Sequence, residues 1–91
     1  MFNFEWDDQK AAGNLVKHAV SFDEAVRVFG DTLALTFSDT DHSEVEERSR
    51  TYGFSNRERV LVVVHTERRN NIRIISARKA TRYEKNIYKD S

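Results

Sequence analysis

The sequence predicts an α+β domain in which two helices precede a small four-stranded antiparallel sheet and one helix follows it. Two observations predict this order. Apolar residues recur with the helical period early in the chain, whereas later segments alternate or are continuously β-branched over short runs, as strands are. The turns between these runs are short, which favours an antiparallel meander. With 91 residues, no linker and no repeat, we expect a single domain over residues 1–91.

The chain is expected to begin with an extended segment and a first helix. Residues 2–6 are predicted to form a short strand or an extended arm. Asp7 or Asp8 can cap the helix that follows, because a short acidic side chain accepts hydrogen bonds from free backbone N–H groups. This helix is expected over residues 8–17 and has only a thin apolar stripe.

A second helix is marked more clearly. The sequence "SFDE" is a capping box, with Ser21 as the cap and Glu24 three residues later. Four apolar residues then fall on one helix face: Phe22, Ala25, Val26 and Phe29. Gly30 is expected to supply the left-handed residue at the end of this helix.

Four strands and a last helix follow. "TLALTF" alternates and predicts a half-buried strand over residues 32–37, while residues 45–54, with few apolar positions, are expected to form a strand partly at an edge. "RVLVVVH", residues 59–65, is typical of a central strand, and "IRIISA", residues 72–77, predicts the fourth strand. The turn "ERRNN" contains asparagines, which tolerate left-handed angles. The last helix is expected over residues 77–88.

The net charge is zero, but it is unevenly distributed along the chain. Residues 1–47 hold eleven acidic and three basic residues, whereas residues 48–91 hold four acidic and twelve basic residues. Residues 65–84 alone hold six arginines or lysines around the apolar segment 72–75. A cationic half can attract a polyanion, because its field acts locally over about 10 Å in salt; alternatively, it pairs with the acidic half across the fold.

The composition also excludes several classes of function. Without cysteine there is no disulfide and no thiolate chemistry, which fits a cytoplasmic protein. No apolar run is long enough for a membrane span, and the N-terminus does not resemble a signal peptide. The spacing of His18, His42 and His65 with Asp39 and Asp41 fits no standard metal site, so we expect neither a metal nor another cofactor.

Three stretches of the sequence resemble one protein family. "FEWDDQKAAGNLVKHAVSFDEAVRVF", "VVVHTER" and "IRIISARKATRYE", in this order, are similar to the BrnT family of toxins from bacterial type II toxin–antitoxin pairs. The resemblance covers about residues 3–88 and implies a fold similar to that of RelE-type ribonucleases. It implies RNA cleavage that arrests translation. It also implies a cognate antitoxin, a BrnA-like dimeric DNA-binding repressor, with two toxins bound to one antitoxin dimer.

Two positions depart from this family pattern. Ala19 and Asn56 stand where the family often has glycine. Asparagine can adopt a left-handed backbone conformation, but in alanine that conformation is strained.

RNA cleavage needs proton transfer and arginines rather than a metal, because the 2′-hydroxyl of RNA can attack its own adjacent phosphorus. His65 and Glu67 are the candidate proton-transfer groups. The alternatives are a backbone hydrogen bond for His65 and a salt bridge for Glu67. Arg78, expected at the head of the last helix, can bind two phosphate oxygens, and Arg68 could reach the same site.

Six further residues are candidates for RNA binding: Lys17, His18, Arg73, Lys79, Arg82 and Tyr83. The first two end the first helix, where cations also favour the helix dipole. The three later cations could instead form a general electrostatic surface or bind the antitoxin. Tyr83 could stack on a base or pack against the sheet.

Strand alternation makes one further prediction. If the fourth strand has no bulge, Ile72, Ile74, Ser76 and Arg78 share one face of the sheet, and Arg73 lies on the other. We expect Arg78 and His65 to converge where a phosphodiester can bind. The alternative is a non-catalytic basic module that binds nucleic acid or a partner protein.

Overall fold

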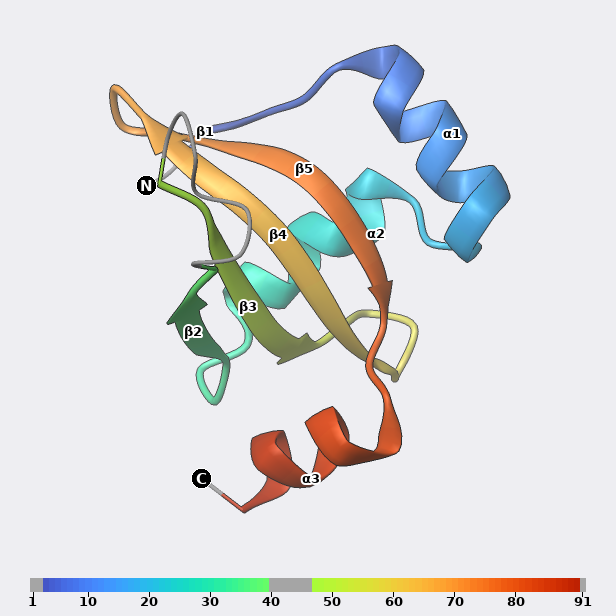
Figure 1. Ribbon diagram of the computed structural model, residues 1–91, viewed down its shortest axis with the longest axis vertical. Coiled ribbons are helices and arrows are strands. Elements are labelled where there is room, and N and C mark those ends of the chain that lie inside the picture. Colours follow the sequence, from blue (N-terminus) through green and yellow to red (C-terminus); the bar gives the residue numbers. More distant parts are fainter. Residues whose placement is uncertain (1–2, 40–46, 91) are drawn as a thin grey trace.

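One mixed β-sheet organises the protein, and helices lie on both of its faces (Figure 1). The computed structural model describes residues 3–39 and 47–90. The elements in chain order are β1 (Asn3–Glu5), α1 (Asp8–His18), α2 (Phe22–Arg27), the 3-10 helix η1 (Val28–Gly30), β2 (Leu35–Ser38), β3 (Ser49–Phe54), β4 (Val60–Arg68), β5 (Asn71–Lys79) and α3 (Arg82–Lys89). None of the described helices is long and apolar enough to cross a membrane.

The sheet has five strands in the order β1-β5-β4-β3-β2, so the predicted four-stranded antiparallel sheet is wrong. Strands β2 to β5 are antiparallel neighbours, as their short connections predict. The additional strand is β1, which pairs in parallel with β5 and places Phe4 opposite Ile72. A parallel pair requires a long crossover, and the chain from α1 to β4 supplies it. Strand β1 thereby covers an edge of β5 that would otherwise be unpaired.

The first two of the predicted strands are shorter than expected. Strand β2 begins at Leu35 rather than at residue 32, and β3 begins at Ser49 rather than at residue 45. Residues 45 and 46, like Asp41 and His42 of the preceding loop, lie outside the described residues.

The end of the fourth predicted strand also differs. Strand β5 continues to Lys79, so the last helix begins at Arg82 rather than at residue 77. Thr81 caps this helix: its hydroxyl accepts a hydrogen bond from the backbone N–H of Glu84 at 3.2 Å. The carboxylate of Glu84 accepts the reciprocal bond from the backbone N–H of Thr81 at 2.8 Å. This second capping box positions Glu84 at the start of α3.

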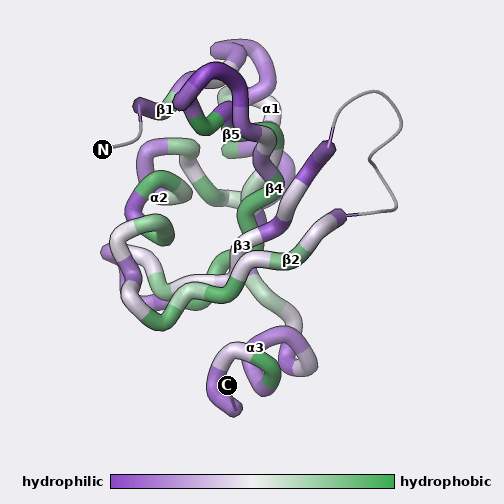
Figure 2. The backbone as a smooth tube through the Cα atoms, turned by 90° about the vertical axis from the view of Figure 1, so that its left-hand side faces the viewer, coloured by the Kyte–Doolittle hydropathy of each residue, from purple (hydrophilic) through white to green (hydrophobic). Residues whose placement is uncertain are grey.

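Two hydrophobic clusters lie on opposite faces of the sheet. The larger one packs α1 and α2 against what we call the core face, and its buried members are Val20, Phe22, Ala25, Val28, Leu61, Val63, Ile72, Ile74 and Ala77. The smaller one lies under α3, on what we call the α3 face, and its buried members are Tyr52, Val62 and Ala80. Helix α3 covers only one end of its face (Figure 1), and in Figure 2 hydrophobic and hydrophilic stretches alternate along α2, α3 and the strands.

A β-bulge in β5 changes which residues share a face. The ladder between β4 and β5 shifts register after Val64, and Ile75 is the extra residue. Ile74, which precedes the bulge, lies on the core face. Ala77, which follows the bulge, also lies on the core face, and its neighbour Arg78 therefore lies on the α3 face. The prediction that Arg78 shares a face with Ile74 is therefore wrong, because it assumed a strand without a bulge.

A buried ion pair fixes the turn between α1 and α2 against the β3–β4 hairpin. The carboxylate of Glu24 accepts hydrogen bonds from Arg59 at 2.6 and 2.7 Å and from the hydroxyl of Ser55 at 2.7 Å. The bond from Arg59 outweighs burial and lowers the pKa of Glu24. Arg59 also donates to the carbonyl of Ala19 at 2.9 Å. Only half of the predicted capping box forms, because Ser21 accepts from the N–H of Glu24 while the Glu24 side chain turns to Arg59.

Left-handed residues occur at the helix end and at the hairpin turns. Ala19 ends α1 with a φ of 57°, so an alanine adopts the left-handed conformation there. Gly30, which was predicted to be left-handed, has no positive φ, because the chain continues there as η1. Arg69 and Asn70 have φ values of 48° and 72°, and they form a two-residue turn whose twist matches that of β4 and β5.

We expect Ala19→Gly to stabilise the protein by about 1 kcal/mol, because glycine adopts the left-handed conformation without the clash of a Cβ. The midpoint of urea unfolding measures this change. Ala12→Gly, an exposed position inside α1, is the matched control and should destabilise by about 1 kcal/mol. An Ala19→Gly variant that is less stable than the parent protein would contradict the assignment of strain to this residue.

Candidate functional site

The strand register brings two arginines together on the α3 face. Arg78 of β5, Val62 of β4 and Tyr52 of β3 lie opposite one another in one row across the sheet. In the adjacent row, Arg50 of β3 lies opposite Val64. Because only one strand separates β3 from β5, the two arginine backbones are on the order of 10 Å apart, a gap that two long side chains can span.

The guanidinium of Arg78 is held by the first turn of α3. Its Nη1 and Nη2 atoms donate to the two carboxylate oxygens of Glu84 at 2.7 and 2.9 Å, and Nη1 also donates to the carbonyl of Lys79 at 3.3 Å. The hydrogen bond with Glu84 raises the pKa of Arg78. The bond with Arg78 in turn lowers the pKa of Glu84 to about 2. Both groups are therefore charged at any physiological pH.

This ion pair leaves one edge of Arg78 for another anion. Of the five N–H donors of a guanidinium, Nε–H and the outer hydrogen on Nη2 are not used by Glu84 or by the Lys79 carbonyl. These two donors form an edge that matches two phosphate oxygens. The side chain of Arg78 is 40% exposed and that of Glu84 is 12% exposed. Glu84 thus orients the guanidinium without saturating it.

Arg50 is a candidate that the sequence analysis missed. Its Nε atom is buried and has no hydrogen-bond partner among the described residues. Leaving such a donor unpaired costs free energy, and a bound anion would remove that cost. A signal was present in "RTYGF", where Arg50 and Tyr52 alternate with small or polar residues. The low hydrophobicity of the segment instead suggested only a charged edge strand.

His65 lies on the core face, and the structure does not bring it together with Arg78. Its Nε2 atom shares a hydrogen bond of 2.8 Å with the hydroxyl of Thr51, and its ring packs edge-on against Phe29 at 4.9 Å. The residue is only 4% exposed, and its Nδ1 atom is buried without a partner in the described part of the chain. Burial lowers the pKa of His65 to about 4, so the imidazole is neutral at physiological pH.

The other two predicted catalytic residues lie at the hairpin end of β4. Glu67 is exposed and lies opposite Ile72, which places it on the core face. Arg68 follows on the α3 face, but six residues separate it from the row of Arg78, a distance of about 20 Å along a strand. The four predicted catalytic residues therefore do not form a single cluster.

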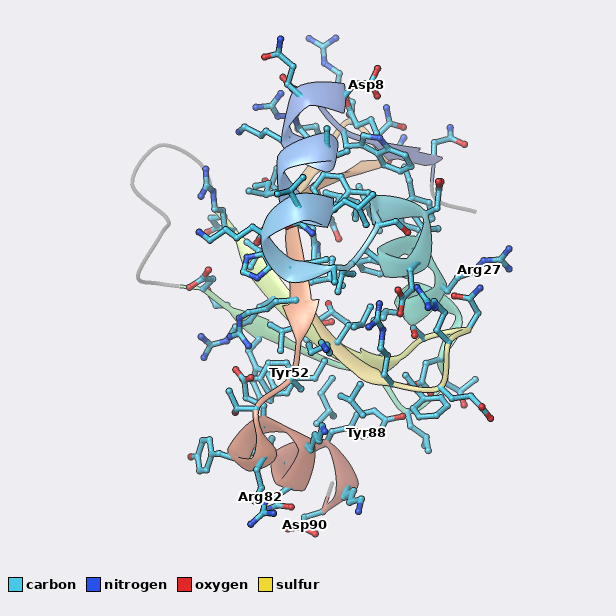
Figure 3. All side chains as sticks on the ribbon, turned by 90° about the vertical axis from the view of Figure 1, so that its right-hand side faces the viewer. Asp8, Arg27, Tyr52, Arg82, Tyr88 and Asp90 are labelled. Carbon is cyan, nitrogen blue, oxygen red and sulfur yellow. The ribbon has the colours of Figure 1, made fainter. Side chains whose placement is uncertain are left out.

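Three of the predicted RNA-binding residues follow Arg78 closely in the chain. Lys79 is exposed at the end of β5 and lies opposite Leu61, which places it on the core face rather than on the face of Arg78. Arg82 and Tyr83 are exposed in the first turn of α3, and Arg82 points away from the sheet (Figure 3). Of the three, only Arg82 and Tyr83 lie on the helix that holds the Arg78–Glu84 pair.

The remaining predicted RNA-binding residues lie elsewhere. Arg73 shares the α3 face but donates a hydrogen bond of 3.1 Å to Glu5 of β1. Lys17 and His18 lie in the last turn of α1, over the core face. Among the described residues, no group of three or more histidines, cysteines and acidic residues could hold a metal ion.

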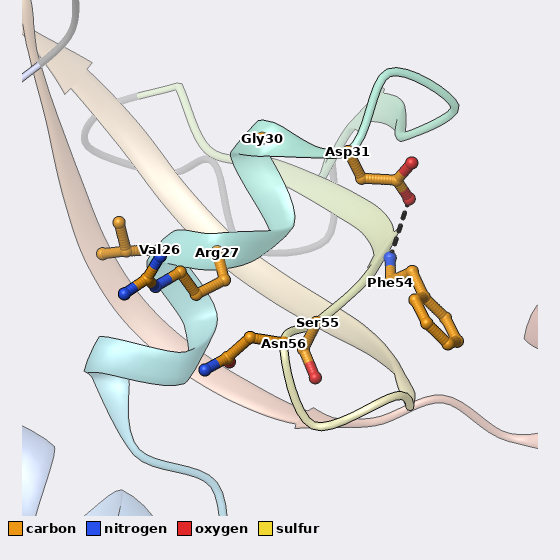
Figure 4. A pocket seen from close by; sticks show the side chains of 7 residues that line it. All are labelled: Val26, Arg27, Gly30, Asp31, Phe54, Ser55 and Asn56. Carbon is orange, nitrogen blue, oxygen red and sulfur yellow. Dashed lines mark hydrogen bonds between the residues drawn. The ribbon is translucent and has the colours of Figure 1, made fainter.

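Among the described residues, two of the cavities lie beside strands β2 and β3. One, of about 440 Å³, lies between α2 and the β3–β4 turn (Figure 4), and Asp31 at its rim accepts a hydrogen bond from the backbone N–H of Phe54 at 2.8 Å. Asp31 also accepts a hydrogen bond from the hydroxyl of Tyr88, which attaches the end of α3 to the rest of the fold. The other cavity, of about 640 Å³, lies between β2 and α3.

These features define the class of the protein: a small α+β domain with a mixed sheet, one face of which carries arginines. A family model described as "Ribonuclease toxin, BrnT, of type II toxin-antitoxin system" matches residues 6–84, and the chain belongs to this family. The resemblance predicted from the sequence motifs is thereby confirmed. Membership implies RNA as the substrate and an antitoxin as the partner.

A solved structure shows the same fold. The crystal structure of the Brucella abortus ribonuclease toxin BrnT is 20% identical in sequence and has a TM-score of 0.69, covering 90% of this chain and 100% of that one. At this identity the similarity establishes the fold alone. None of the curated proteins matches the sequence.

We expect the stability of the protein to fall as the pH drops from about 6.5 to about 4, because His65 binds a proton in the unfolded chain but not in the folded one. The contribution of His65 to the change in the free energy of unfolding approaches about 1.4 kcal/mol per pH unit. Urea unfolding at several pH values measures it, and His65→Gln should remove this contribution. A His65 imidazole that titrates near pH 6.5 by NMR would contradict the burial effect.

Proposed function

We propose that this protein is a metal-independent endoribonuclease that binds an RNA phosphate on the free edge of Arg78. The observation that carries the proposal is the Arg78–Glu84 pair, which holds a charged, partly exposed guanidinium with two donors that neither Glu84 nor the Lys79 carbonyl uses. The neighbouring Arg50 adds a buried N–H without a partner among the described residues. Two cations on one sheet face suit a phosphodiester whose charge increases during cleavage.

The reaction consists of one displacement at phosphorus. The 2′-oxygen forms a bond to the adjacent phosphorus, the bond from phosphorus to the 5′-oxygen breaks, and the proton lost by the 2′-hydroxyl is balanced by one gained by the leaving oxygen. The products are a 2′,3′-cyclic phosphate and a 5′-hydroxyl. Arg78 would bind the non-bridging oxygens, where negative charge accumulates in the transition state.

Proton transfer requires groups other than the arginines. His65 and Glu67 remain the proposed groups, but both lie on the core face, whereas Arg78 lies on the α3 face. The neutral imidazole of His65 could accept a proton only if RNA or a rearranged β4 gave access to it. A non-catalytic RNA-binding module is the second candidate function, and this separation of His65 from Arg78 is the observation that favours it.

The biological consequence follows from the family. Cleavage of messenger RNA would arrest translation, and the cognate antitoxin, a dimeric DNA-binding repressor, would neutralise the toxin. An antitoxin that covers the α3 face would exclude RNA from Arg78 and Arg50. Two toxins bound to one antitoxin dimer is the proposed assembly.

The test is cleavage of RNA by the purified protein in excess chelator. We expect wild-type cleavage to persist, and Arg78→Ala to lower the rate about 100-fold, the effect of removing one donor to an oxyanion. Arg78→Lys should also lose most activity, because an ammonium cannot bind two oxygens in a fork. The readout is the rate at which 2′,3′-cyclic phosphate ends appear.

A charge-swapped variant separates phosphate binding from stability. Arg78→Glu combined with Glu84→Arg restores an ion pair between β5 and α3 and removes the phosphate donor from β5. Because an arginine at position 84 cannot accept the hydrogen bond of the Thr81 N–H, we expect the free energy of unfolding to fall by about 1 kcal/mol, a loss that leaves the protein folded. We expect a folded protein without cleavage. Full activity in this variant or in Arg78→Ala would refute the role of Arg78. RNA binding without cleavage by the wild type would favour the non-catalytic module.

A further inference from the structure

The cavity between β2 and α3 has apolar walls and aromatic rings at the surface. Its lining residues are Leu35, Phe37, Tyr83, Asn86, Ile87 and Asp90, and its volume is about 640 Å³. Tyr83 is 75% exposed and Phe37 is 40% exposed. The centroids of the Phe37 and Tyr52 rings are 5.2 Å apart, so Tyr52 packs against Phe37 and restrains its ring. Exposed aromatic rings beside a cavity are unusual in a surface that only faces water.

Two arginines of the α3 face, Arg50 and Arg78, are neighbours of residues that line this cavity. Phe37 and Arg50 are direct cross-strand partners in the β2–β3 ladder. On the other side, Tyr83 precedes Glu84, the residue that binds Arg78. An extended polyanion bound at these cations would therefore pass the mouth of the cavity.

We propose that this cavity binds one nucleobase of the RNA whose phosphate lies at Arg78. The inference rests on the proposed function and adds a base site to it. Tyr83 and Phe37 supply faces for stacking, which is sequence-tolerant because every base has a π-face. At the rim, the Asn86 amide can both donate to and accept from a base edge, and the Asp90 carboxylate can accept from an amino group.

The charges around the cavity favour RNA over an apolar protein segment as the occupant. Arg50 lies opposite Phe37 in the β2–β3 ladder, Arg78 binds Glu84 next to Tyr83, and Arg82 is exposed in the first turn of α3. An apolar side chain of a partner would fill the walls but would offer no acceptor to Arg50 or to the free edge of Arg78. A nucleotide fills the cavity with its base and neutralises an arginine with its phosphate.

The experiment compares two 2′-O-methyl oligonucleotides, which the enzyme cannot cleave, by fluorescence anisotropy. One carries all its bases and the other carries abasic positions on the same phosphate backbone. We expect the wild type to bind the complete oligonucleotide about tenfold more tightly, the scale of one stacked base. Tyr83→Ala should abolish this difference, whereas Tyr83→Phe should keep it.

Control variants separate the base site from the phosphate site. Helix α1 packs over the core face, away from the cavity, and Val16→Ala removes an exposed apolar side chain from it. This variant should bind both the complete and the abasic oligonucleotide as tightly as the wild type does. Arg78→Ala should weaken both oligonucleotides by the same factor, because both carry phosphates. If Arg78→Ala changes neither affinity, or the wild type binds neither oligonucleotide, the proposed function itself fails.

Two other outcomes overturn the base site alone. Equal wild-type affinity for the two oligonucleotides would show that no base is bound. A Tyr83→Ala variant that binds a co-expressed partner protein less tightly, yet keeps the preference for bases, would assign the cavity to that protein instead.

Discussion

The bulge at Ile75 is the constraint on which the candidate site depends. A strand without it would direct Arg78 into the core beside Ile74 and would bring Ala77 to the surface. Because of the one extra residue, Ile74 before the bulge and Ala77 after it are both buried in the core, and Arg78 points towards α3. The same register leaves His65 on the core face. One inserted residue therefore decides which side of the sheet can bind an anion and which side is packed.

Helix α3 completes the site although it contributes no buried residue of its own. It is attached at its start by Glu84, which binds Arg78, and near its end by Tyr88, which donates to Asp31. Burial and this bond raise the pKa of Tyr88 to about 12, so its hydroxyl is a permanent donor at physiological pH. Because α3 has no buried residue, these two polar attachments contribute to holding the helix against the sheet.

The sequence predicted the elements with strong periodicity and missed the features that depend on register. The helix after Ser21 and the central strand were predicted because many residues repeat one pattern. A short strand or extended arm was predicted over residues 2–6, but the parallel pairing of β1 with β5 was not, because three residues carry no pattern and the partner strand is remote in sequence. The bulge leaves no sequence signal, so Arg78 was expected to converge with His65. Arg50 was overlooked because a cation in a poorly hydrophobic strand resembles an ordinary solvated edge residue.

The most direct test of the central claim, that RNA binds the α3 face through arginine, is NMR of the arginine side chains during titration with a 2′-O-methyl oligonucleotide. The Nε–H signal of each arginine reports on its own guanidinium edge. We predict that the signals of Arg78 and Arg50 shift together, whereas that of Arg27, exposed on α2, stays unchanged. An unchanged Arg78 signal, accompanied by shifts of His65 and of α1, would contradict the account and place the RNA on the opposite side of the protein.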